Sequence, residues 1–207
     1  MQVLPVGRAQ VPGRTNLKWR HTRVAVQQLT GIGPAGQAQA LGFNLCGITP
    51  ARPAPHLEAY LRWIDQGLHG SLNYMARPDR VARRRDLNEI LSGARSMILV
   101  ALDYHQLPLP EAVERDPTRG RIAMYAWGAD YHELMLPRLE ALAEGLRAET
   151  SGGVRWRAYV DTGAVLERDH AQQAGLGFIG KNTLLIHQRR GSGFFLGEIL
   201  TDAEIDV

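Results

Sequence analysis

One acidic residue and a glycine-rich segment stand close together near the end of the chain, and both can take part in chemistry. Asp161 lies in the sequence VDTG, and the run GLGFIGK follows at 175–181. Two apolar runs come next, at 184–186 and 194–196, joined by a glycine-rich turn. Because glycine lets a ligand approach the main chain closely, this combination indicates a site for a flat or phosphorylated ligand.

The glycine run also matches the letters of a phosphate-binding loop. Residues 175–180 fit G-x-G-x-x-G, and Lys181 extends the match toward G-x-x-x-x-G-K-[ST], although Asn182 replaces the Ser or Thr. Such loops bind phosphate because they lead from a strand into a helix N-terminus. Here a helix pattern at 167–174 precedes the run and a short strand pattern at 183–186 follows it. A phosphate-loop nucleotide hydrolase is therefore the weaker functional alternative.

The segments that must position this site alternate between strand and helix patterns. A long helix is predicted to begin at Asp130, which has capping-box spacing to Glu133, and to end before Gly152. Its apolar stripe consists of Met135, Leu139, Leu142 and Leu146. Further strands are predicted at 43–49, 96–102 and 155–160, a helix at 56–66, and a partly helical segment at 21–41. The alternation predicts an α/β fold, in the form of an α+β sandwich.

Composition narrows the class of protein. The 207 residues are 44% hydrophobic and 22% charged, as in an ordinary globular domain. No apolar run approaches the roughly 20 residues of a membrane helix, and the N-terminus lacks a signal-peptide pattern, so we expect a cytoplasmic protein without membrane contact. The single cysteine, Cys46, excludes an internal disulfide and any multi-cysteine metal site in this chain, and we expect it to be a buried thiol.

Basic residues are concentrated at the start of the chain. Six of them precede the first acidic residue, Glu58, and residues 1–20 combine prolines and glycines without an apolar period. We expect a loose basic leader at 1–20 and one folded domain at 21–207. A basic arm suits a nucleic-acid partner, and an unpacked leader explains it equally well. The cluster VARRR at 81–85 is either a solvated face or an anion-binding site.

Six segments, taken together and in order, resemble the epoxyqueuosine reductase family. They are LGFNLCGIT at 41–49, GLHGSLNYM at 67–75, RRDLNEILSGARSMI at 84–98, GADYHELM at 128–135, VDTGAVLERDHAQQAGLGFIGKNTLLI at 160–186 and GSGFFLGEILTD at 191–202. The resemblance implies an N-terminal cobalamin-binding domain with a nitroreductase-like α/β fold. It also implies an oxidoreductase of queuosine biosynthesis that reduces epoxyqueuosine in the anticodon loop of tRNA to queuosine.

The resemblance assigns roles to particular residues. Asp161 corresponds to the acid proposed as proton donor beside the cobalt, whereas the residues alone allow it to be an N-cap of the next helix. The positions expected to line the cobalamin are Arg84, Ala123, Asp161, Leu185 and Leu196. Arg168 is expected to face a phosphate of the substrate.

The implied chemistry sets a requirement on Asp161. Low-valent cobalt is a nucleophile that can attack an epoxide carbon, and the oxygen then needs a proton to leave as water. A carboxylic acid donates a proton near neutral pH when burial raises its pKa. We therefore expect the Asp161 side chain to be buried.

The sequence departs from the family pattern in three respects. Met124 stands where relatives usually carry Arg, and Ala129 replaces a common basic residue, so contacts to cofactor or tRNA are expected to be weaker. The family continues into a ferredoxin-like part whose cysteines hold two [4Fe–4S] clusters, for which this chain has no ligands. We expect a monomeric N-terminal fragment that is inactive alone, from a truncated or split gene or an incomplete sequence. Its electron donor is not identified by the sequence, and a stand-alone corrinoid-binding module is the alternative.

Overall fold

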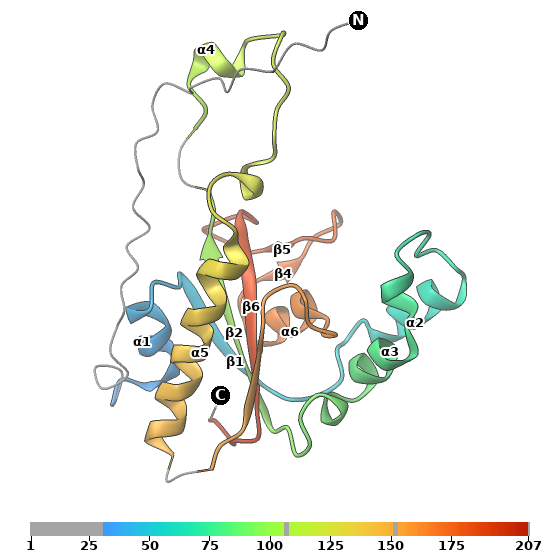
Figure 1. Ribbon diagram of the computed structural model, residues 1–207, viewed down its shortest axis with the longest axis vertical. Coiled ribbons are helices and arrows are strands. Elements are labelled where there is room, and N and C mark those ends of the chain that lie inside the picture. Colours follow the sequence, from blue (N-terminus) through green and yellow to red (C-terminus); the bar gives the residue numbers. More distant parts are fainter. Residues whose placement is uncertain (1–30, 106–107, 151–152, 207) are drawn as a thin grey trace, which may run out of the picture.

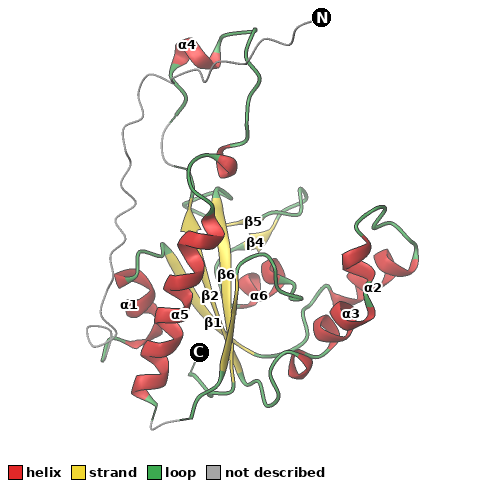
Figure 2. Cartoon of the chain, in the orientation of Figure 1, coloured by secondary structure: helices red, strands yellow, loops and turns green. Residues whose placement is uncertain are grey.

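A four-stranded antiparallel sheet in the order β1-β2-β6-β3 forms the centre of the molecule, and a two-stranded ribbon, β4-β5, lies beside it (Figures 1 and 2). The computed structural model describes residues 31–105, 108–150 and 153–206, so the predicted basic leader at 1–20 lies outside the described residues. The strands are β1 (Leu45–Pro50), β2 (Ser96–Asp103), β3 (Trp156–Tyr159), β4 (Phe178–Ile179), β5 (Leu185–Ile186) and β6 (Phe194–Thr201). The helices are α1 (Gly33–Ala40), α2 (Leu57–Asp65), α3 (Pro78–Arg85), α4 (Glu111–Glu114), α5 (Tyr131–Glu149) and α6 (Glu167–Gln173).

Strand β2 shows why the sheet needs a helical layer on each face. Its run SMILVALD is apolar almost throughout, and successive side chains of a strand point to opposite faces. Ile98 and Val100 pack on the side of α1 and α5, whereas Met97 and Leu99 pack on the side of α6. Both layers bury these side chains completely. The predicted α/β sandwich is confirmed by this arrangement.

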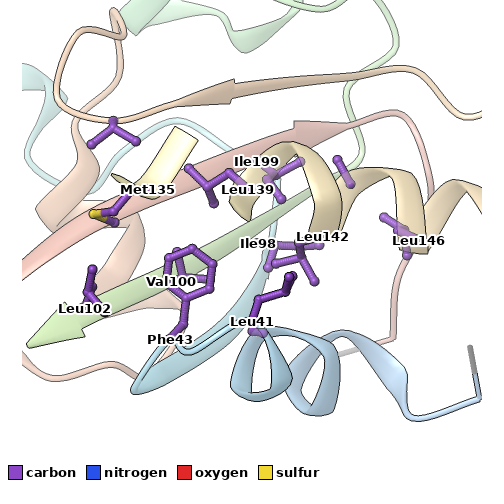
Figure 3. Packing of buried hydrophobic residues seen from close by; sticks show 13 residues of the cluster. Leu41, Phe43, Ile98, Val100, Leu102, Met135, Leu139, Leu142, Leu146 and Ile199 are labelled. Carbon is purple, nitrogen blue, oxygen red and sulfur yellow. The ribbon is translucent and has the colours of Figure 1, made fainter. Parts of the chain in front are cut away.

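Helix α5 supplies most of one layer. Its predicted apolar stripe is buried, and Figure 3 shows Met135, Leu139 and Leu142 packed against the side chains of β2 and β6. The helix begins after Asp130, whose Oδ1 accepts a hydrogen bond of 2.9 Å from the backbone N–H of His132. This cap places Tyr131, the first residue of the helix, at the end of the sheet where β2 finishes and β6 starts.

The glycine run at 175–181 is a helix stop followed by a ribbon. Gly175, with φ +77°, ends α6 as expected, and Phe178 of β4 pairs with Ile186 of β5. The structure shortens the predicted strand at 183–186 to Leu185–Ile186. From the run to residue 206 the described chain contains strands and turns but no helix, so the phosphate loop lacks its helix N-terminus. The phosphate-loop alternative is therefore wrong in its structural context.

Two expectations from composition concern Cys46 and membranes. The Cys46 thiol is half-buried, its Sγ lies 3.9 Å from the carbonyl oxygen of Pro34, and burial raises its pKa to about 11. A thiol with this pKa stays protonated near neutral pH and is a poor nucleophile.

Within the described residues, no helix is long and apolar enough to cross a bilayer.

Candidate active site

A groove lies at the end of the sheet where β2 finishes and β6 begins. It encloses about 220 Å³ and is open on one side. Its walls combine aromatic and aliphatic side chains with two acids and one arginine. The lining residues are Tyr104, Tyr131, Asp161, Glu167, Arg168, Leu184, Leu185, Ser192, Phe194, Phe195 and Leu196. An apolar hollow with a few convergent polar groups is the usual form of a small-molecule site.

The backbone at Asp161 is held in an unusual conformation. Its φ is +59°, and the Thr162 N–H donates a hydrogen bond of 2.6 Å to the Val160 carbonyl across it. This is a γ-turn with positive φ, which is a rare and strained form. Asp tolerates such a φ better than most residues, and strained conformations are concentrated at functional sites. The turn directs the carboxylate of Asp161 to the groove.

Two neighbouring elements hold this turn in place. The Tyr131 hydroxyl of α5 donates a hydrogen bond of 3.0 Å to Asp161 Oδ2, and Nη1 of Arg80 in α3 donates one of 3.3 Å to the Thr162 carbonyl. The Tyr131 ring stacks on Phe195, with centroids 4.1 Å apart and planes 6° from parallel. Desolvation, together with the nearby Asp161 carboxylate, raises the pKa of Tyr131 well above its ordinary value. Tyr131 therefore remains a proton-bearing donor to Asp161.

The structure corrects the prediction that the Asp161 side chain is buried. The residue is exposed at the mouth of the groove. It does not serve as the N-cap of α6 either, because Leu166 occupies that position and makes no side-chain capping bond. Several loop residues separate Asp161 from α6. Both predictions for its environment, a buried acid and a helix cap, are therefore wrong.

Two buried or half-buried acids lie behind Asp161. Glu167, the first residue of α6, is half-buried; burial, assisted by the charge of Asp161, raises its pKa to about 7. Glu198 of β6 is fully buried, and neither of its carboxyl oxygens has a hydrogen-bond partner. Neither acid was predicted from the sequence to belong to the site. A signal was available for Glu198, since it stands between Leu196 and Leu200 at alternate positions of an apolar strand, which is the buried face.

The predicted cofactor and substrate residues are only partly brought together. Asp161, Leu185, Leu196 and Arg168 line the groove, and Nη1 of Arg168 donates a hydrogen bond to the Thr183 carbonyl.

Arg84 and Ala123 do not line the groove. Arg84 is buried in α3, with its guanidinium 5.1 Å from the centre of the Tyr60 ring. Ala123 is exposed in the segment before α5. Their contacts with a cofactor stay predictions.

The fold and the groove define a mixed α/β domain with an open groove at the end of its sheet, lined by two acids and a tyrosine hydroxyl. Comparison with known proteins shows what this domain is similar to. The family model described as "Epoxyqueuosine reductase QueG, DUF1730" matches residues 84–162. The epoxyqueuosine reductase of Pseudomonas aeruginosa is 40% identical over 171 residues, which are 81% of this chain and 46% of that protein.

Solved structures agree with this assignment. The epoxyqueuosine reductase of Streptococcus thermophilus superposes with a TM-score of 0.71 at 31% identity, over 84% of this chain and 46% of that one. An epoxyqueuosine reductase solved with an epoxyqueuosine-modified tRNA-Tyr stem loop gives 0.64 at 26% identity, over 87% and 47%. The chain is therefore a relative of epoxyqueuosine reductases, as the six segments predicted, and it spans about half the length of the curated relatives it matches.

Proposed function

We propose that this chain is the cobalamin-binding part of an epoxyqueuosine reductase. The observation that carries the proposal is Asp161, held on a strained turn by the Tyr131 hydroxyl at the mouth of an apolar groove. In this proposal electrons come from iron–sulfur clusters on another part of the protein. No group of three or more residues suited to bind a metal occurs in the part of the chain that the structure describes.

The groove fits a flat, largely apolar ring laid against its open side. Leu185, Leu196 and Phe194 provide an aliphatic and aromatic wall, and Leu184 is 43% exposed at its rim. The enclosed 220 Å³ admits part of a corrin ring, so the rest would lie along the exposed rim. The polar groups at the mouth suit the amide-bearing edge of such a ring. Leu185, Leu196 and Phe194 would therefore hold part of the ring of a cobalamin in the groove, with Asp161 at its mouth.

In this reaction the chain's own residues bind, orient and deliver protons. Bound cobalamin supplies the nucleophilic, low-valent cobalt, which the protein cannot provide itself. Asp161 donates a proton to the oxygen that leaves the substrate, and Tyr131 fixes the orientation of its carboxyl group. The stack of the Tyr131 ring on Phe195 holds the tyrosine hydroxyl in place beside the acid.

An RNA substrate is supported by the arginines of α3. Arg77, Arg83 and Arg85 are exposed on this helix or at its start, and Arg80 joins it to the Asp161 turn. Guanidinium groups bind phosphate oxygens well. In this proposal the α3 arginines contact the backbone of a tRNA whose anticodon loop reaches the groove, and Arg168 contacts a phosphate near the reacting nucleoside.

Titration of the purified chain with cob(II)alamin, followed by visible and EPR spectra, tests the proposal. We expect a spectral change that saturates with one equivalent. The variant Asp161→Asn keeps a residue that tolerates positive φ and removes the acid. It should bind cobalamin as the wild-type chain does and lower turnover by about 100-fold or more when the chain is joined to the iron–sulfur part.

The possible outcomes separate the alternatives. A chain that leaves the cob(II)alamin spectrum unchanged would overturn the proposal. Binding without any turnover, in a chain joined to a functional iron–sulfur part, would favour the stand-alone corrinoid-binding module. Full turnover by Asp161→Asn would remove Asp161 from the reaction.

A further inference from the structure

Glu198 is a buried carboxyl group without a partner. Its exposure is 0%, and both carboxyl oxygens lie in the interior without a hydrogen bond. A buried carboxylate without a cation or donor is costly, so such a group persists in the protonated form. A buried group that serves only packing is normally apolar, since an aliphatic side chain fills the same space without this cost. The position therefore calls for an explanation beyond packing.

The carboxyl group of Glu198 lies directly behind the Asp161 turn. A Cβ atom added to Gly163, two residues after Asp161, would stand 3.1 Å from Glu198 Oε1 and 2.8 Å from Cγ of Tyr159. Because Gly163 has no side chain, the carboxyl group of Glu198 can pack directly against the backbone there. Tyr159 of β3 is also the register partner of Glu198, so the acid is enclosed between the sheet and the turn.

The groups that face Glu198 carry negative charge or none. Glu167 approaches from α6 and Asp161 from the turn, and β2 contributes the apolar Leu99 as register partner. Burial first, and then the charges of Glu167 and Asp161, raise the pKa of Glu198 well above its ordinary value. Burial, and then the charge of Asp161, raise the pKa of Glu167 to about 7, whereas the charges of Arg84 and Arg168 act to lower it. Glu167 and Asp161 thus line the groove, and Glu198 lies in the interior close enough to be affected by both charges.

Removal of an epoxide oxygen consumes two protons. Both carbon–oxygen bonds break, a carbon–carbon double bond forms, and the oxygen leaves as water with two protons and two electrons from a low-potential reductant. Asp161 can donate one proton in each turnover. We propose that Glu198 stores the second proton and passes it through Glu167 to Asp161 as the departing oxygen, a stronger base than any of the three carboxylates, takes the proton of Asp161. This inference rests on the proposed function, in which Glu198 acts through other residues and does not touch the substrate.

The protonation state of Glu198 is measurable without turnover. Infrared difference spectra of the wild-type chain and Glu198→Gln at pH 7 should show one protonated carboxyl band that the variant lacks. Above the ordinary pKa of 4.5 the unfolded chain releases this proton while the folded chain keeps it, so stability falls as pH rises. Glu198→Gln should remove this loss and have the higher Tm at pH 8. An ionised Glu198 at pH 7 would overturn the proposal.

The transfer of the proton is tested by the pH profile of turnover in the chain joined to its iron–sulfur part. Glu198→Gln should lower kcat about tenfold or more at pH 8, with KM unchanged and a smaller effect at pH 6, where solvent supplies protons more readily. Glu198→Asp should recover part of the rate. The control is Asp169→Asn, which removes a different buried carboxylate. Asp169 lies in α6 and accepts a hydrogen bond from the backbone N–H of His56. This variant should lower Tm without changing the shape of the pH profile.

The outcomes separate this inference from the proposed function. A pH profile of Glu198→Gln that matches the wild type would overturn proton storage even if the protonated band is present. Absence of cobalamin binding would instead overturn the proposed function, and proton storage for that reaction with it, while the infrared band would still report the protonation of Glu198.

Discussion

The contact between Tyr131 and Asp161 joins two segments that are 30 residues apart in the chain. The Tyr131 ring is fixed by its stack on Phe195, so the hydroxyl reaches Asp161 Oδ2 from a rigid base. The Asp161 backbone is fixed separately, by the hydrogen bond between Thr162 and Val160. The position of the carboxyl group is therefore set from two sides before any ligand binds.

Removing the Tyr131 hydroxyl should weaken this control while leaving the fold intact. Tyr131→Phe keeps the ring on Phe195 and deletes the donor to Asp161. A hydrogen bond to a charged group contributes about 1.5–3 kcal/mol, so we expect kcat to fall roughly tenfold or more. Cobalamin affinity and Tm should change little. Tyr125→Phe, which removes an exposed hydroxyl that does not line the groove, is the control. Equal turnover in both variants would contradict the role of Tyr131.

At the level of single residues, the sequence predicted a role for Asp161 but not its environment. The family resemblance pointed to this acid, and its role stays a prediction. Its exposure depends on where the loop between β3 and α6 leaves the sheet, and no local pattern encodes that. Glu198 was missed because a charged residue in a strand is ordinarily assigned to the solvent face. Only the position of α6 over that face makes Glu198 a buried acid.

Elements with a long apolar period were predictable, and short ones were not. The stripe of α5 repeats over most of its length, so both its extent and its buried face followed from spacing. The strands β4 and β5 have two residues each, and their pairing depends on the close approach of Gly177 to Ile186. Such an approach is a tertiary contact, which a window of sequence does not contain.

The ribbon should be sensitive to a single methyl group at Gly177. A Cβ there would stand 2.4 Å from the carbonyl oxygen of Ile186, a backbone atom that cannot turn away. We expect Gly177→Ala to lower the free energy of unfolding by about 3 kcal/mol and to weaken cobalamin binding, because Leu184 and Leu185 of the groove wall would shift. Denaturant unfolding and the cob(II)alamin titration measure the two effects.

Gly120 provides the matched control for this substitution. A Cβ at Gly120 meets nothing within 4 Å, and its backbone does not need positive φ. Gly120→Ala should therefore change stability by about 0.5 kcal/mol or less. Similar losses for the two variants would show that the close contact at Gly177 does not constrain the ribbon.

At the scale of the whole molecule, the described surface segments differ in how many of their arginines are paired with acids. Helix α3 reaches the Asp161 turn through Arg80, and its one acid, Asp79, is paired with Arg77. In the segment before α5, by contrast, Arg115 pairs with Glu111 and Arg119 with Asp116. An anionic polymer is therefore expected to dock along α3.

Binding of an anticodon stem-loop RNA should reveal this difference. Replacing both Arg83 and Arg85 with Ala should weaken binding and reduce the slope of log affinity against log salt by roughly 1.5, since each phosphate contact contributes about 0.7–0.9. Replacing Arg115 and Arg119, which are already paired with acids, should leave the slope near its wild-type value. Fluorescence anisotropy at several salt concentrations measures both. Equal slopes in the two double variants would exclude α3 as the RNA surface.

The two edge strands of the sheet, β1 and β3, affect whether copies of the chain can associate at high concentration. Strand β3 has four residues, and Nη1 of Arg157 donates a hydrogen bond of 3.1 Å to the carbonyl of Trp156, an acceptor that a docking strand would otherwise use. Strand β1, at the opposite side, ends in Pro50, which has no N–H to offer. Edge strands that are short, or that lack a free donor or acceptor, discourage strand pairing between molecules. We therefore expect concentrated solutions to resist fibril growth, even though the interior strands are among the most apolar segments of the sequence.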